Sequence, residues 1–190
     1  CYPQFSGLMN LTSSWMADEG VIVDTEGDIG HTVVMQILNM CAGGGPTVLG
    51  EVGSYDDEKN YLAIAHEGST AHSMAESLDK VQIYPRGEKG TFVGVPVKAM
   101  PVVTVASIQG SAGNYQMLIA KGRTLPVTHE EWVEGGSKLL AHLQFEKKAS
   151  QMVREMMEAG LDHHLLIKEG DHTEMLSDVC DFMGIKKVLL

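Results

Sequence analysis

The chain has 190 residues, of which 44% are hydrophobic and 21% charged, a composition typical of a globular protein with a sizeable core. No stretch approaches the roughly 20 consecutive apolar residues of a membrane-spanning helix. Asp and Glu outnumber Lys and Arg by 25 to 14, and the net charge of −11 repels phosphate backbones and anionic lipid. We therefore expect neither nucleic acid nor a membrane among the partners of this protein.

The cysteines are few and have no metal-type spacing. They are Cys1, Cys41 and Cys180, and this sparse, odd set favours reduced thiols in a reducing compartment. A basic segment followed by an apolar one, as in a secretory leader, is not visible, so we expect a cytoplasmic location. Because the chain begins with Cys instead of Met, we also expect it to be part of a longer protein.

Residues 1–80 are predicted to alternate between strands and helices. Apolar runs predict strands at 21–25, 47–52 and 61–65, and helical spacing of apolar residues predicts a helix at 29–41. Strand–helix alternation of this kind favours a mainly parallel sheet. We therefore interpret residues 1–80 as a mainly parallel α/β segment.

The remaining chain divides into two further segments. Short β-branched runs separated by Gly-rich turns predict an antiparallel β-barrel-like domain over residues 81–145. An α/β tail follows over residues 146–190, with amphipathic helices near 149–157 and 175–183 and short strands at 165–167 and 187–190. The predicted fold class is therefore α/β, with the barrel-like domain between two α/β segments.

Side chains at four places next to apolar runs could bind a metal. Glu26, Glu51 and His66 each follow or end such a run, and the pair His163–His164 precedes another. In open α/β sheets, ligands collect at the carboxyl ends of strands, where side chains can converge. Two carboxylates with one or two imidazoles suit a divalent ion such as Mn²⁺ better than a metal that prefers thiolates. The sequence therefore predicts a divalent metal site.

Each candidate also has a structural interpretation. Glu26 could be an exposed carboxylate near a helix N-terminus, and Glu51 could face water on an edge strand. His66 could be a buried histidine with a purely structural role. His163 and His164 could complement a helix C-terminus, and adjacent strand residues point to opposite faces, so at most one of the two should reach a shared site.

Nearly the whole chain, in order, resembles the carboxy-terminal half of the L-fucose/L-arabinose isomerase superfamily. The motifs that carry this resemblance are Cys1-Tyr-Pro-Gln-Phe5, Glu26-Gly-Asp28, Glu51 after an apolar strand, His66-Glu-Gly68, Met100-Pro-Val-Val-Thr-Val105 and Asp162-His-His164. The resemblance implies a Mn²⁺-dependent aldose–ketose isomerase that acts on a small-molecule sugar. It also implies a homo-oligomer, with amino-terminal domains that are absent here.

The resemblance assigns roles to particular residues. Glu26 and Glu51 would be metal ligands and also the acid and base that move a proton between C1 and C2 through an enediol. His164 would be the late histidine ligand. His66 matches a further ligand of arabinose isomerases that fucose isomerases do not use, so the sugar stays open.

Two other functions remain open at this point. The chain could be a non-catalytic module that binds a carbohydrate or mediates assembly, and such a module would need no metal. It could also be a metal-dependent hydrolase or aldolase with the same ligands. The products formed from aldoses would distinguish these enzymes from an isomerase.

Overall fold

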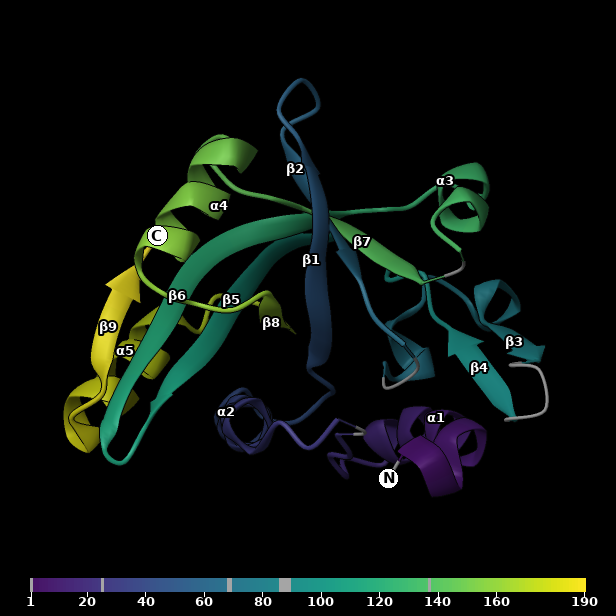
Figure 1. Ribbon diagram of the computed structural model, residues 1–190, viewed down its shortest axis with the longest axis horizontal. Coiled ribbons are helices and arrows are strands. Elements are labelled where there is room, and N and C mark those ends of the chain that lie inside the picture. The colour runs from purple at the N-terminus through teal and green to yellow at the C-terminus, as the bar shows by residue number, and fades with distance from the viewer. Residues whose placement is uncertain (1, 25, 68–69, 86–89, 137) are drawn as a thin grey trace.

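The computed structural model describes residues 2–24, 26–67, 70–85, 90–136 and 138–190, with side chains from residue 9 onward within those ranges (Figure 1). Cys1, the side chains of residues 2–5 and Gly68, which form part of the motifs quoted above, lie outside the described residues. None of the described helices is long and apolar enough to cross a membrane. Cys41 is an exposed free thiol and Cys180 a buried one.

Helices and strands alternate irregularly along the chain. The helices are α1 (Tyr2–Asp18), α2 (Ile29–Cys41), α3 (His129–Glu134), α4 (Ala149–Glu158) and α5 (Thr173–Met183), with short 3-10 turns at His72–Met74 and Leu78–Lys80. The strands are β1 (Val48–Asp56), β2 (Tyr61–Ala65), β3 (Gln82–Pro85), β4 (Thr91–Gly94), β5 (Met100–Ser111), β6 (Asn114–Leu125), β7 (Leu139–Gln144), β8 (His164–Glu169) and β9 (Lys186–Leu189).

The main sheet closes into a ring of strands. Its order is β5-β8-β1-β2-β7-β6-β9, and β5 also pairs with β6, so the first six strands form a closed circuit to which β9 is added. Strands β3 and β4 form a separate small sheet. The α/β class predicted from the sequence is confirmed, and strands from all three predicted segments pair in this ring.

The prediction of a mainly parallel sheet for residues 1–80 was wrong. Strand β1 runs antiparallel to both β2 and β8, and β6–β9 is the parallel pair among the described strands. The reason lies in the turn after β1, where the Asp56 carboxylate accepts the backbone N–H groups of Glu58 and Lys59. This local turn reverses the chain within a few residues, so β1 and β2 form a hairpin and need no crossover helix.

The strand predicted at residues 21–25 is not formed. Residues 21–24 have no regular secondary structure, and Thr25 lies outside the described residues. The Asp24 carboxylate instead accepts the backbone N–H groups of Glu26, at 2.9 Å, and Asp28. Such local side-chain bonds favour a turn over a sheet ladder. Helix α1, which precedes this turn, was not predicted.

The two faces of the ring strands bury two separate cores. Leu165 and Ile167 of β8 belong to the larger cluster, together with Leu62 and Ile64 of β2. Leu166, between them in sequence, joins a second cluster that includes Leu38 of α2 and Cys180 of α5. This alternation follows from the two-residue repeat of a strand. Helices α2 and α5 therefore cover one face of the sheet, and α2 contacts β5 and β8 directly.

Candidate metal centre

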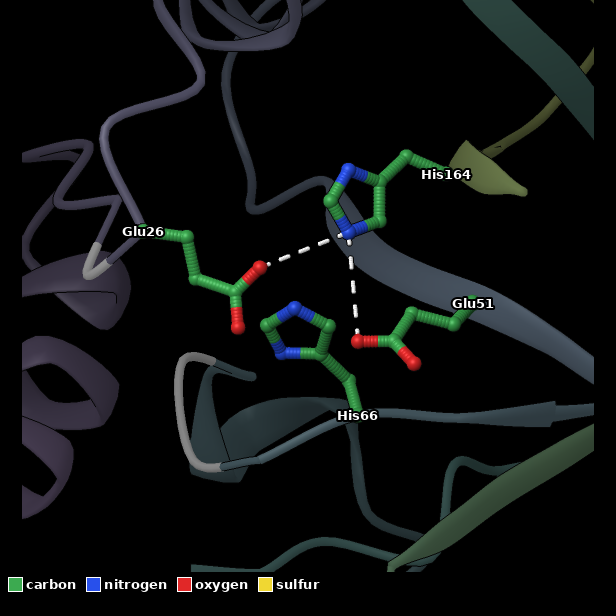
Figure 2. Close-up of side chains that lie close together, drawn as sticks. All are labelled: Glu26, Glu51, His66 and His164. Carbon is green, nitrogen blue, oxygen red and sulfur yellow. Dashed lines mark ion pairs between the residues drawn. The ribbon is translucent and has the colours of Figure 1, made fainter. Parts of the chain in front are cut away.

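Four side chains predicted from the sequence converge in the structure. Glu26, Glu51, His66 and His164 each offer one ligand atom, and these four atoms all lie within 4.8 Å of one another. Figure 2 shows the two carboxylates and the two imidazole rings directed toward a common point. The residues come from the turn before α2, from β1, from the end of β2 and from the start of β8.

Strand register brings Glu51 and His164 together and places His66 nearby. Strand β1 lies between β8 and β2, and Glu51 pairs with His164 on one side and with Ala65 on the other. His66 follows Ala65 directly, and its backbone N–H donates to the Lys138 carbonyl at 3.0 Å. The register therefore places Glu51 and His164 side by side on neighbouring strands, and His66, one residue beyond the end of β2, approaches them from outside the strand.

This register corrects part of the reasoning from the sequence. Glu51 lies within β1, which continues to Asp56, and His164 begins β8, so the residues do not meet at the carboxyl ends of parallel strands. The edge-strand interpretation of Glu51 was also wrong, because β1 is paired on both sides. The register shifts just after Glu51, between Val52 and Ser54, and such bulges commonly lie next to functional sites.

Glu26 reaches these side chains from a tight turn. The Asp24 carboxylate accepts the Glu26 backbone N–H, and Gly27 adopts a left-handed conformation with φ of 86°. Asp28 then caps α2, since its carboxylate accepts the backbone N–H of His31 at 3.1 Å. The Glu26 side chain is 35% exposed, and its Oε2 lies 3.5 Å from His164 Nε2.

His164 lies at the centre of the cluster. Its side chain is 12% exposed, and Nε2 faces Glu26 Oε2 at 3.5 Å and Glu51 Oε1 at 3.9 Å. Nε2 is shielded from solvent and makes no hydrogen bond within the described part of the chain. The backbone N–H of His164 donates to the Asp162 carboxylate at 2.8 Å, which fixes the start of β8. His163 is exposed and outside the cluster.

Burial favours the neutral form of His66. The residue is 2% exposed, and this burial lowers the pKa of its imidazole below the ordinary value, although the charges of Glu26 and Glu51 act in the opposite direction. A neutral imidazole is the form that coordinates a metal. The downward shift in the pKa of His66 therefore favours the form that can bind a metal.

The donor set fits a hard divalent cation. Two carboxylates and two imidazoles supply mixed oxygen and nitrogen ligands, which are suited to Mn²⁺ and related ions. Among the described residues, Lys and Arg form no ion pair with Glu26 or Glu51. The buried His164 Nε2 points toward both carboxylates. A cation at this point would balance their charge and bind this nitrogen, which makes no hydrogen bond among the described residues.

A second network lies behind His164 and was not predicted from the sequence. Asp28 Oδ2 lies 2.6 Å from His31 Nδ1 and 3.1 Å from His164 Nδ1, and His31 Nε2 lies 3.0 Å from Ser107 Oγ. Burial by itself raises the pKa of Asp28. Hydrogen bonds from His31 and His164, together with the nearby His31 ring, lower the pKa by more, so the net shift is downward. The Asp-x-x-His spacing at a helix start was the available signal. Ser107 gave none.

Comparison with known proteins gives related sequences. No family model matches the chain. It is 29% identical to proteins named sulfoquinovose isomerase from Priestia aryabhattai and Priestia megaterium, in alignments of 192 residues that cover 98% of this chain and 42% of each relative. A protein of the same name from Alkalicoccus urumqiensis is 26% identical over 188 residues, 94% of this chain and 40% of its own. The chain thus spans about two fifths of the length of these relatives.

Proposed function

We propose that this chain carries the metal centre of an aldose–ketose sugar isomerase, with sulfoquinovose as the first substrate to test. The convergence of Glu26, Glu51, His66 and His164 within 4.8 Å is the observation that carries this proposal. The similarity of nearly the whole chain to proteins named sulfoquinovose isomerase supports it. The complete enzyme would be a homo-oligomer, as the resemblance to fucose and arabinose isomerases implies.

The four side chains would hold a divalent cation, with Mn²⁺ as the first candidate. Glu26 and Glu51 would supply carboxylate oxygens, and His164 would supply Nε2. His66 would complete the set with its neutral ring. Such a cation, when bound, acts as a Lewis acid toward two adjacent sugar oxygens.

The two glutamates would also move the protons. One carboxylate would take the proton from C2 of the aldose, and the other would give a proton to C1, while the proton of the 2-hydroxyl passes to the former carbonyl oxygen. An enediol lies between the two transfers. Positioned general acids and bases of this kind contribute about 10²–10⁴-fold to rate. The exposure of Glu26 and Glu51, 35% and 37%, leaves both carboxylates open to a ligand from solvent.

Sugar conversion by the full-length protein tests this function. The protein is stripped with EDTA, reloaded with Mn²⁺ and incubated in D₂O with sulfoquinovose, L-fucose or L-arabinose, and the products are identified by NMR. We expect a ketose with the same number of carbons as the aldose, formed only after reloading, with deuterium from the solvent at C1.

Other outcomes would favour the alternatives. Cleavage to shorter products would indicate an aldolase or hydrolase with the same ligands. Binding of a sugar without conversion, in a protein that takes up no Mn²⁺, would indicate a carbohydrate-binding module. Either result would contradict the proposed isomerase.

A further inference from the structure

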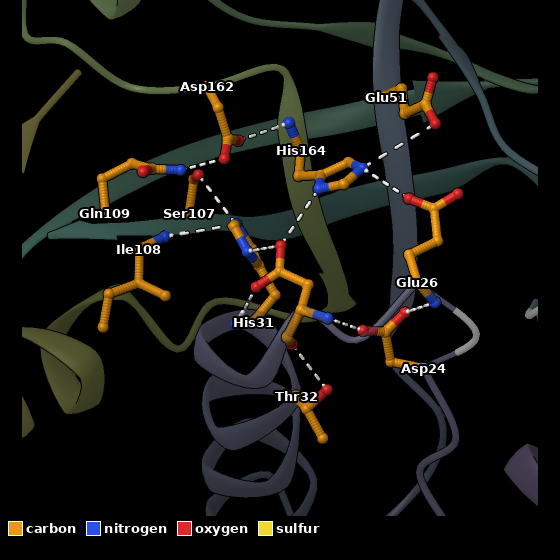
Figure 3. A network of polar contacts seen from close by, with 11 residues as sticks. Asp24, Glu26, His31, Thr32, Glu51, Ser107, Ile108, Gln109, Asp162 and His164 are labelled. Carbon is orange, nitrogen blue, oxygen red and sulfur yellow. Dashed lines mark hydrogen bonds and ion pairs between the residues drawn. The ribbon is translucent and has the colours of Figure 1, made fainter. Parts of the chain in front are cut away.

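The network behind His164 has a defined direction of hydrogen bonding. The Ile108 backbone N–H donates to His31 Nε2 at 3.4 Å, and a backbone amide can only donate. His31 Nε2 is therefore an acceptor, and the neutral ring carries its proton on Nδ1. That Nδ1–H donates to Asp28 Oδ2 at 2.6 Å. Figure 3 shows His31 between Ser107 and Ile108 on one side and the cluster on the other.

The same oxygen of Asp28 also fixes the ring of His164. An ionised carboxylate only accepts hydrogen bonds, so His164 Nδ1, 3.1 Å from Asp28 Oδ2, must be the donor. A neutral His164 then has its lone pair on Nε2, the atom that faces Glu26 and Glu51. The tautomer that a metal ligand needs is thus set from the opposite side of the ring.

Asp28, His31 and Ser107 are built rigidly into the fold. His31 is 1% exposed and Ser107 is fully buried. Asp28 Oδ1 caps α2 while Oδ2 serves the two rings, so one carboxylate joins the start of α2 to β5 through His31 and to β8 through His164. Asp28, His31 and His164 also have ligand atoms within 4.8 Å of one another. The hydrogen bonds among them occupy those atoms, which argues against a second cation between them.

We propose that Asp28, oriented by His31, is a positioning residue that holds His164 in the tautomer with a free Nε2 and so sets the affinity of the site for a divalent cation. This inference rests on the proposed function, because it assumes that His164 Nε2 is a metal ligand. Loss of a carboxylate behind a ligating histidine typically costs 10- to 100-fold in metal affinity.

Two pairs of variants of the full-length protein test the inference. Asp28→Asn keeps the size of the side chain and a good helix cap, but its amide can donate to His164 Nδ1 and so favours the wrong tautomer. Thr32→Ala is the matched control, because Thr32 Oγ1 donates to the Asp28 main-chain carbonyl, at 2.8 Å, at the same helix start. His31→Leu removes the hydrogen-bond donor to Asp28 and leaves the Asp28 carboxylate in place. His31→Asn retains a donor near the position of Nδ1.

Mn²⁺ affinity, measured by electron paramagnetic resonance of free Mn²⁺, is the readout, and the melting temperature without metal is recorded beside it. We expect Asp28→Asn and His31→Leu to bind Mn²⁺ about 10- to 100-fold more weakly. His31→Asn should recover part of this loss, and Thr32→Ala should bind as the wild type does. Thr32→Ala weakens the same helix start and shows how far a lower melting temperature alone reduces Mn²⁺ affinity. A loss of affinity beyond that in Asp28→Asn or His31→Leu is assigned to positioning of His164.

Two results would overturn the proposal, and they differ in what else they remove. Wild-type affinity in Asp28→Asn, or in His31→Leu, would show that Asp28 and His31 do not position the ligand, while the metal centre itself would stand. Absence of Mn²⁺ binding by the wild-type protein would remove the metal centre and this inference with it.

Discussion

At the scale of the residue, the candidate metal centre depends on the unusual placement of two polar side chains, Glu51 and His164. Glu51 interrupts an apolar run in a strand that is paired on both sides, and its side chain is partly exposed beside His164. His164 places a shielded nitrogen opposite two carboxylates. Both features were visible in the sequence as a charge within a β-like run and a histidine at the edge of another.

Substitution of Glu51 tests its role. Glu51→Gln keeps the shape of the side chain but removes the negative charge and the proton acceptor. We expect kcat for sugar isomerisation by the full-length protein to fall by about 10²–10⁴-fold, the usual contribution of a general acid or base. Glu58→Gln, in the exposed turn after β1, is the control and should retain wild-type kcat. Isomerase activity near the wild-type level in Glu51→Gln would remove Glu51 from the site.

At the scale of the element, close packing of β1 against β2 holds Glu51 in register. A Cβ built on Gly50 would lie 2.3 Å from Ile64 Cγ2, whereas one on Gly53 would meet its nearest neighbour, the Ala63 carbonyl oxygen, at 3.6 Å. Gly50 is therefore required by the close approach of Ile64, one residue before the candidate ligand. Gly53 lies in the same strand without such a neighbour.

The pair Gly50→Ala and Gly53→Ala tests this packing. Gly50→Ala must displace Ile64 or shift β1, and overpacking of a core typically costs about 1–3 kcal/mol. We expect the melting temperature of the full-length protein, measured by differential scanning calorimetry, to fall in Gly50→Ala. Gly53→Ala should change stability by less than about 0.5 kcal/mol. Equal melting temperatures for the two variants would show that the β1–β2 contact does not constrain the register.

The helices and strands also show which parts of the fold could be predicted from the sequence. Apolar periodicity located α2, β2 and α5 closely, because each has a clear buried face. It gave a strand at residues 21–25, because Val21, Ile22 and Val23 have strand propensity, but the bonds from Asp24 to the following backbone prevail. It also missed the hairpin, because the Asp56 turn was included in a longer loop.

At the scale of the whole molecule, the site exists because β1 lies between β8 and β2 in the sheet. Glu51 pairs with Ala65, only fourteen positions away in the chain, and with His164, more than a hundred positions away. Periodicity gives the face of each side chain but not the order of strands, so convergence was a hypothesis until the register was known. Ser107, on β5 of the same ring, had no signal at all in the sequence.

The fold also gathers three carboxylates around one histidine of an already acidic protein. The net charge is −11, and Glu26, Glu51 and Asp28 lie around His164. Clefts lined by one sign of charge concentrate counter-ions. The acidic composition of the chain is therefore consistent with a site that attracts a divalent cation.

Anomalous diffraction from crystals of the full-length protein grown with Mn²⁺ tests the central claim most directly. We expect one strong anomalous peak per chain, within coordination distance of carboxylate oxygens of Glu26 and Glu51 and of His164 Nε2, with Nδ1 of the same ring still bonded to Asp28. A Mn²⁺ peak elsewhere in the chain, with these side chains uncoordinated, would contradict the account.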